Sequence, residues 1–169
     1  MSAPSSTNIG PQHLNSLPRP ELIKQLLACL CIQRWAADIA DSRPFSSLDA
    51  IYAAAEHAAP DLTTEELNSA LSAHPRIGER SEHDSWSRTE QSGVDSQDAA
   101  LAEQLRRGNE EYERRFGHVY LVCASGRGGA ELLEILRSRL DNDVETEARI
   151  VDDELRKIAR LRLARLIEQ

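Results

Sequence analysis

The chain has 169 residues, of which 40% are hydrophobic and 28% charged, a balance typical of a soluble globular protein with a sizeable core. Its formal net charge is −8 and no basic stripe is present, so we expect no nucleic-acid partner. No apolar run approaches the length of a membrane span, so we expect no membrane partner either.

The first part of the chain predicts a tail followed by two helices. Residues 1–17 are rich in Ser, Pro, Asn and Gln, and we expect a flexible N-terminal tail. From Pro18 onward, apolar residues recur at a helical spacing, and this first helix should end near Pro44. A serine at position 46 or 47 is the expected N-cap of a second helix, which Pro60 closes.

The rest of the chain alternates helices with two irregular segments. Thr63 and Glu66 have capping-box spacing and begin a short third helix that ends before His74. Residues 75–95 should be irregular, and residues 119–124 should be buried, extended backbone without a partner strand. Further helices are expected over residues 97–116, 129–141 and 143–167. This order predicts an all-α fold, a single helical domain over residues 18–169 with irregular active-site segments.

The cysteines indicate a reducing compartment. Cys29, Cys31 and Cys123 are odd in number, and the first two form C-x-C rather than C-x-x-C. The N-terminal sequence lacks the charged and apolar regions of a secretory signal. We therefore expect free thiols and a cytoplasmic protein.

The stretch "SAHPRIGER" (72–80) contains the first candidate for chemistry. A histidine before a proline often marks only the end of a helix. A neutral imidazole at a helix end can also take or give a proton near pH 7, and Pro75 would stiffen the backbone of His74.

The stretch "SRTEQ" (87–91) allows two interpretations. Ser87 and Glu90 have the spacing of a capping box, which would tie Glu90 to the start of a short helix. Alternatively, the N–H groups of this turn bind an anion, and Gln91 offers its amide to a polar heterocycle. A carboxylate used as a cap is less free to move protons, so the two interpretations compete for Glu90.

The stretch "VYLVCASGR" is either a core segment with a Gly turn or a ligand-binding stretch. An extended segment without a neighbouring strand has N–H and C=O groups that a flat, amide-rich ligand could satisfy, and Arg127 could add a charge. The five histidines form no i, i+4 pair, and no H-E-x-x-H or C-x-x-C motif is present. We therefore expect no metal site.

Six motifs in a fixed order carry a family resemblance. They are "SRPF" (42–45), "HPRIGER" (74–80), "SRTEQSGV" (87–94), "NEEYERRFG" (109–117), "YLVCASGR" (120–127) and "KIARLRLARL" (157–166). With this set the chain resembles the OHCU decarboxylase family, which acts on 2-oxo-4-hydroxy-4-carboxy-5-ureidoimidazoline in the last step from urate to allantoin. It departs from many members at His118-Val119, where they have Phe-Pro, and from some animal members at Ser125, where they have Arg.

The resemblance implies an all-helical fold, no cofactor, and a homodimer that converts this small-molecule substrate to (S)-allantoin. It places the catalytic role on His74 and a substrate contact on Glu90, and we expect Glu90 to act with His74 in handling protons. The substrate-binding residues that it implies are Pro75, Ser87, Gln91, Tyr120, Leu121, Val122, Cys123 and Ala124. We add Arg127 as a candidate, because it lies two positions after Ser125, where some animal members have Arg. Arg76 and Arg162 are further candidates, to which we assign no catalytic role.

The sequence leaves two other functions open. A non-enzymatic helical interaction module would use an apolar helical face, and would not need His, Glu and Gln side chains that converge on a pocket. An enzyme of the same fold could also act on another ureide, because methylene-scale differences in a pocket do not show in motifs.

Overall fold

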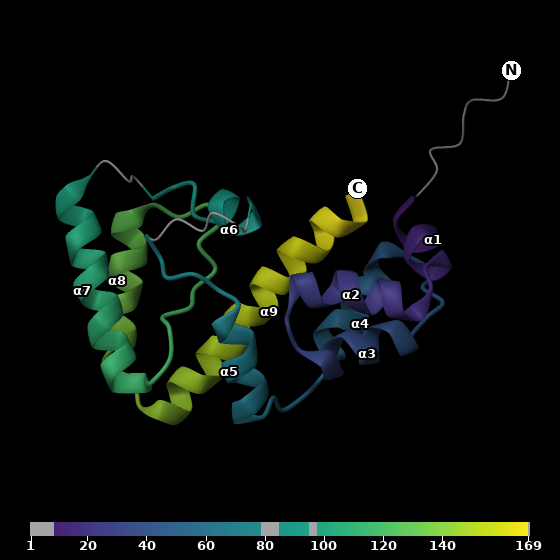
Figure 1. Cartoon of the computed structure of the whole chain (residues 1–169), viewed down its shortest axis with the longest axis horizontal. Helices are drawn as coiled ribbons and strands as arrows, with labels where there is room; N and C mark the ends of the chain where they lie inside the picture. The colour runs from purple at the N-terminus through teal and green to yellow at the C-terminus, as the bar shows by residue number, and fades with distance from the viewer. Residues whose placement is uncertain (1–8, 79–84, 95–97, 169) are drawn as a thin grey trace, which may run out of the picture. The chain divides into compact units, whose positions relative to one another are not determined.

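The computed structural model describes residues 9–78, 85–94 and 98–168. Within these residues the chain forms helices and connecting segments but no β-strand, which confirms the predicted all-α fold class (Figure 1). The helices are α1 (Ile9–Ser16), α2 (Arg19–Cys29), α3 (Gln33–Asp41), α4 (Leu48–His57), α5 (Thr64–Ser72), α6 (Ser85–Glu90), α7 (Ala99–Phe116), α8 (Gly129–Arg139) and α9 (Val144–Glu168). None of the helices in the described residues is long and apolar enough to span a bilayer.

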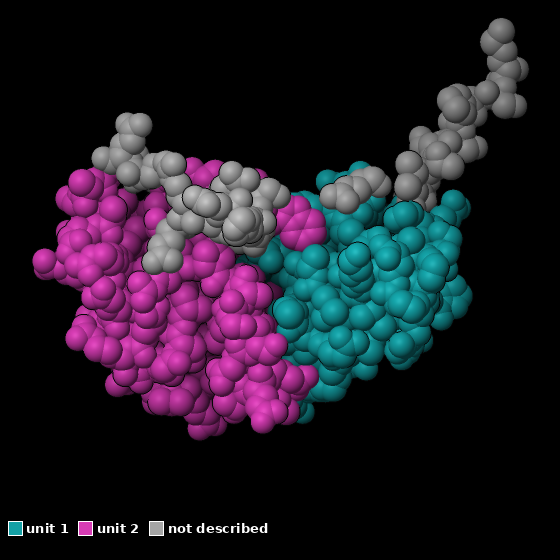
Figure 2. All heavy atoms as spheres, in the orientation of Figure 1, with its two compact units in different colours: residues 1–62, 158–169 teal, residues 63–157 magenta. Residues whose placement is uncertain are grey.

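The chain divides into two compact units (Figure 2). Unit 1 consists of residues 1–62 and 158–169, and unit 2 consists of residues 63–157. Helix α9 contributes its N-terminal part to unit 2 and its C-terminal part to unit 1. No Gly- or Ser-rich linker marks either boundary, so the pattern of residues did not predict this division.

The N-terminal region differs from the flexible tail expected over residues 1–17, because α1 forms inside it. Leu14 of this helix is fully buried. The Asn15 side chain exchanges two hydrogen bonds with the backbone of Phe45, donating to the carbonyl oxygen (3.0 Å) and accepting from the N–H (2.8 Å). These contacts reach thirty positions along the chain, and therefore no local composition signals them.

The predicted first helix is in fact two helices, α2 and α3. Between them, Leu30 and Ile32 have extended backbone conformations, and both side chains are buried. Trp35 of α3 is buried as well, and its indole N–H donates to the Ala55 carbonyl oxygen (3.1 Å). The apolar residues continue through the break because both helices bury them, so the helical periodicity did not reveal it.

Helix ends that depend on local chemistry lie where the sequence predicted them. Ser47 caps α4 by accepting the Ala50 N–H (3.1 Å). Thr63 and Glu66 form both hydrogen bonds of the capping box at the start of α5 (3.1 and 3.0 Å). Gly117 ends α7 in the left-handed conformation, with φ of 77°, which glycine adopts without steric cost.

The segment that joins α7 to α8 lies against the core of unit 2. The side chains of Tyr120, Val122 and Ala124 belong to the apolar cluster formed with both helices, whereas Leu121 and Cys123 do not. Contact with the core at every second residue is typical of extended backbone, in which side chains alternate between two faces. The segment therefore has the buried, extended character that the sequence predicted.

Candidate active site

His74 follows the C-terminal end of α5. Its N–H donates to the Leu71 carbonyl oxygen (3.1 Å) and so closes the helix. The His74 residue is half-buried, and it lines a cavity of about 420 Å³ in unit 2 together with Pro75, Glu113 and His118. The residue thus marks a helix end and also borders a space that could hold a ligand.

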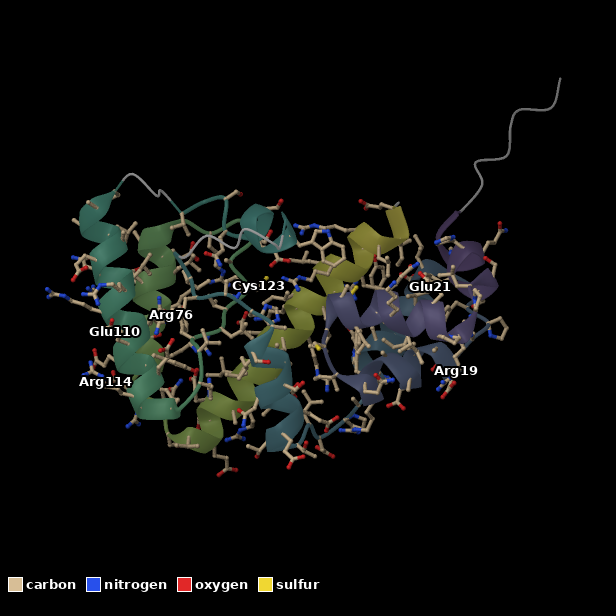
Figure 3. All side chains as sticks on the ribbon, in the orientation of Figure 1. Arg19, Glu21, Arg76, Glu110, Arg114 and Cys123 are labelled. Atoms are coloured by element: carbon tan, nitrogen blue, oxygen red, sulfur yellow. The ribbon has the colours of Figure 1, made fainter. Side chains whose placement is uncertain are left out.

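Two side chains of α7 hold the loop that follows His74. Arg76, labelled in Figure 3, forms a bidentate ion pair with Glu113 (2.7 and 2.6 Å). Asn109 is buried and donates to the Ile77 carbonyl oxygen (3.0 Å). Both contacts join residues more than thirty positions apart and fix the backbone that carries His74.

Gln91 also holds this loop, through two hydrogen bonds. Its Oε1 accepts the Gly78 N–H (2.9 Å), and its Nε2 donates to the Arg76 carbonyl oxygen (3.4 Å). The sequence suggested that this amide faces a polar heterocycle. In this structure, both ends of the amide bind the backbone of the loop.

Of the two interpretations of Ser87 and Glu90, the capping box does not agree with the structure. α6 begins at Ser85, so Ser87 lies inside the helix rather than before it, and Glu90 is its last residue. The Glu90 residue is only 6% exposed. Its carboxylate is therefore not an N-terminal cap of α6.

Glu90 lies near the extended segment. Burial is the main cause that raises the pKa of the Cys123 thiol (Figure 3 labels Cys123), and the charges of Glu154 and Glu90 raise it further. A carboxylate influences a thiol in this way only at short range. The charge of Glu90 thus acts on the extended segment at Cys123.

Gly93, just after "SRTEQ", closely approaches Arg127, the last residue of "YLVCASGR". A Cβ added to Gly93 would lie 2.2 Å from the Arg127 carbonyl oxygen, so only a glycine allows this approach. The guanidinium of Arg127 forms an ion pair with Glu131 at 3.4 Å and is half-buried. Its positive charge is therefore shared with a carboxylate of α8.

Not all predicted residues line the cavity beside His74. Of the described residues predicted to act in catalysis or to bind substrate, only His74 and Pro75 do so, and the further candidate Arg76 lines it as well. Gln91 reaches that loop through hydrogen bonds, and Glu90 and Arg127 lie with the extended segment. The structure therefore places the predicted residues in two neighbouring groups of unit 2.

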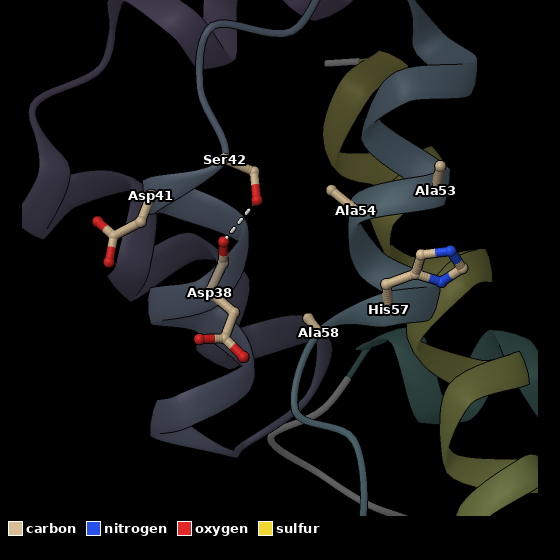
Figure 4. A pocket seen from close by; sticks show the side chains of 7 residues that line it. All are labelled: Asp38, Asp41, Ser42, Ala53, Ala54, His57 and Ala58. Carbon is tan, nitrogen blue, oxygen red and sulfur yellow. Dashed lines mark hydrogen bonds between the residues drawn. The ribbon is translucent and has the colours of Figure 1, made fainter.

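Unit 1 has a cavity of about 520 Å³ between α3 and α4, which none of the predicted site residues lines (Figure 4). Its charged residues already have partners, because Asp38 accepts the Ala59 N–H (2.9 Å) and Asp41 pairs with Arg19 (2.9 Å). Within the described part of the chain, no group of three or more His, Cys, Asp or Glu residues could hold a metal ion.

Sequence reasoning missed three charged residues, two of which hold the extended segment directly while the third holds one of these two. They are Arg139, Glu147 and Glu154, and all three are buried. Glu147 and Glu154 lie on the same stripe of α9 as Val151 and Leu155, which are also buried. A carboxylate within an apolar helical stripe is an available signal, because a buried charge requires a partner.

Comparisons with known proteins identify the family. A sequence profile of the OHCU decarboxylase family matches residues 15–164. The 2-oxo-4-hydroxy-4-carboxy-5-ureidoimidazoline decarboxylase of Haloferax volcanii is 36% identical over 133 residues, covering 77% of this chain and 79% of that protein. The uric acid degradation bifunctional protein of Arabidopsis thaliana is 32% identical over 145 residues, covering 82% of this chain and 45% of that protein.

Solved structures agree with this match. A crystal structure of OHCU decarboxylase in the presence of (S)-allantoin aligns with a TM-score of 0.72 at 30% identity, covering 86% of this chain and 98% of that one. A crystal structure of (S)-allantoin synthase aligns with a TM-score of 0.70 at 17% identity, which shows a shared fold. From the profile match and the identity to relatives, we conclude that the chain belongs to the OHCU decarboxylase family.

Proposed function

We propose that the chain decarboxylates 2-oxo-4-hydroxy-4-carboxy-5-ureidoimidazoline to (S)-allantoin during the breakdown of urate. Its family is one of decarboxylases, which are carboxy-lyases. The observation that carries the proposal is the position of His74 and Pro75 beside a cavity, on a loop held by Arg76, Asn109 and Gln91. A loop fixed at three points can hold an imidazole in one orientation toward a bound ring.

The substrate itself supplies a place for the electron pair. When the bond to the carboxylate breaks, its two electrons form a C=C bond to the neighbouring ring carbon. The C=N electrons of that carbon then move to nitrogen, which takes a proton. Tautomerisation adds a proton to the ureido-bearing carbon and removes the hydroxyl proton, which leaves a carbonyl. Because the ring accepts the electrons, the proposed reaction requires no cofactor and no metal.

Within this scheme, His74 hydrogen-bonds the hydroxyl on the carbon that loses CO2 and removes its proton. Glu90 acts with His74 to deliver the new C–H proton to one face of the ring, which determines the enantiomer. The proposed substrate contacts are Pro75, Ser87, Gln91, Tyr120, Leu121, Val122, Cys123, Ala124 and Arg127. Both ends of the Gln91 amide bind the loop, so Gln91 contacts the ring by releasing the loop. If it keeps these bonds, it acts by holding the loop in place.

Three further features of the protein are part of the proposal. Residues 18–169 form the catalytic domain, the chain acts as a homodimer, and it works in the cytoplasm. The resemblance to the family supports the first two. The three cysteines, none of which is in a disulfide, support the third.

The test uses intermediate generated immediately before the assay. Urate is oxidised enzymatically, 5-hydroxyisourate is hydrolysed, the protein is added, and the optical activity of the allantoin is followed. We expect rapid formation of one enantiomer with the unsubstituted chain and its loss in His74→Asn. Slow, racemic product equal to the protein-free control would contradict the proposal and favour another ureide or a non-enzymatic role.

A further inference from the structure

Two buried side chains from different helices hold the same edge of the extended segment 119–124. Arg139, at the end of α8, donates from Nη1 to the Leu121 carbonyl oxygen (2.5 Å). Glu154 of α9 accepts the Cys123 N–H at Oε2 (2.8 Å). In an extended chain, the N–H and C=O groups of residues two apart point to the same edge. Both hydrogen bonds therefore occupy one edge of this segment.

The other edge carries the peptide groups of Val122. Among the described residues, no hydrogen bond involves the N–H or C=O of Val122, although the residue is buried. The next residue on that edge, Ala124, uses its carbonyl oxygen for the Arg127 N–H (3.1 Å) in the following turn. A buried peptide group without a partner costs free energy, which a ligand with matching donors and acceptors recovers.

The guanidinium of Arg139 is itself fixed by a buried network. Its Nε donates to Glu147 (2.7 Å), its Nη2 also bonds Glu147, and Glu147 accepts the Tyr112 hydroxyl and the Asn142 amide (3.1 Å). Arg139 is 4% exposed and Glu147 is 0% exposed. Burial would lower the pKa of the guanidinium, but the bonds to Glu147 outweigh it and the pKa is raised. The cation thus keeps its charge and its orientation.

Stability alone does not account for such a buried pair. Apolar side chains of similar volume can replace buried ion pairs with little loss of stability, and sometimes with a gain. What an apolar pair cannot do is aim a donor at the Leu121 carbonyl oxygen. Glu154 also aims a polar atom at the segment. Its Oε2 accepts the Cys123 N–H, while its Oε1 accepts a hydrogen bond from the Lys157 ammonium (3.0 Å).

We propose that Arg139 and Glu154 are positioning residues for the substrate, an inference that rests on the proposed function. By occupying Leu121 C=O and Cys123 N–H, they fix the rotation of the segment. The N–H and C=O of Val122 then face the ligand as an adjacent donor and acceptor. This pair matches the amide groups at the edge of the ureidoimidazoline ring.

The first test compares two substitutions at one position. Glu154→Gln keeps an oxygen that can accept the Cys123 N–H, whereas Glu154→Leu removes it. We expect Glu154→Leu to raise KM about tenfold or more, as the loss of a hydrogen bond to a charged group implies, with a smaller change in kcat. Glu154→Gln should stay within about threefold of the unsubstituted chain. Asp152→Leu is the control, because Asp152 pairs with Arg156 on the same helix.

The second test removes the buried pair without stranding a charge. Arg139→Met combined with Glu147→Gln keeps an acceptor for the Tyr112 hydroxyl, so this variant should fold even if Glu154→Leu does not. We expect weaker binding of (S)-allantoin by calorimetry, by about tenfold, and a matching rise in KM.

The outcomes separate the two proposals. If the unsubstituted chain forms one enantiomer but the folded variants keep its KM and its affinity for allantoin, the positioning role is wrong and the proposed function stands. If Glu154→Gln and Glu154→Leu raise KM equally, the charge rather than the hydrogen bond matters, which also overturns the inference. If the unsubstituted chain shows no activity, both proposals fail together.

Discussion

Replacing Asn109 by alanine tests whether α7 holds the loop that carries His74. Asn109 is 2% exposed, and its Nδ2 donates to the Ile77 carbonyl oxygen (3.0 Å). Its Oδ1 is buried and has no hydrogen-bond partner within the described residues. The substitution removes the donor and leaves the carbonyl of Ile77, which is also buried, without this partner.

Three contributions determine the size of the effect on the free energy of unfolding. Losing the partner of a buried carbonyl costs about 1–3 kcal/mol. The cavity left by the side-chain amide adds on the order of 1 kcal/mol. Removing a buried oxygen that had no partner returns on the order of 1 kcal/mol. We therefore expect a net loss of about 2 kcal/mol, or a fall in Tm of about 6 °C.

The assay is urea unfolding followed by circular dichroism, with kcat/KM measured on the same preparation. The midpoint should fall with an unchanged m-value, and kcat/KM should fall because the backbone of His74 is less well held. Glu110→Ala is the control, since Glu110 is the next residue of α7 and pairs only at the surface with Arg106 (2.6 Å). An unchanged midpoint would refute the contribution of the hydrogen bond. A lowered midpoint with unchanged kcat/KM would refute its coupling to His74.

Three further predictions concern other parts of the chain. Gly93→Ala should lower kcat/KM about tenfold, because its Cβ would lie 2.2 Å from the Arg127 carbonyl oxygen and would push two turns of the site apart. Gly128→Ala is the control: its Cβ would meet open space, so kcat/KM should not change. Burial raises the pKa of the Cys29 thiol from 9.0 to about 12, so folding favours the protonated thiol and stability falls as the pH rises above about 9. Between pH 8 and pH 10.5, the loss of unfolding free energy should be about 2 kcal/mol larger in the unsubstituted chain than in Cys29→Ala; equal losses would contradict the raised pKa. A thiol reagent should label the exposed Cys31 in the native protein and Cys29 only after unfolding, so equal labelling rates would show that Cys29 is accessible.

Features that close within one helical turn were predictable from the sequence. Thr63 and Glu66 satisfy each other's backbone groups three residues apart, so their capping box needs no tertiary contact. Gly117 ends α7 because only a residue that tolerates positive φ fits there. Ser87 and Glu90 have the same spacing as a capping box, yet α6 starts two residues before Ser87. The spacing was therefore compatible with a cap without requiring one.

The sequence by itself determined the all-α fold class, most helix ends and, through the order of its motifs, the family. Only the tertiary structure decided which partners the site residues take. Gln91 binds the backbone of Gly78 and Arg76, and the extended segment is held by Arg139 and Glu154. These hydrogen bonds span 13 to 31 residues. A buried polar group takes whichever partner the packing of the helices brings within reach, and spacing along the chain does not encode that choice.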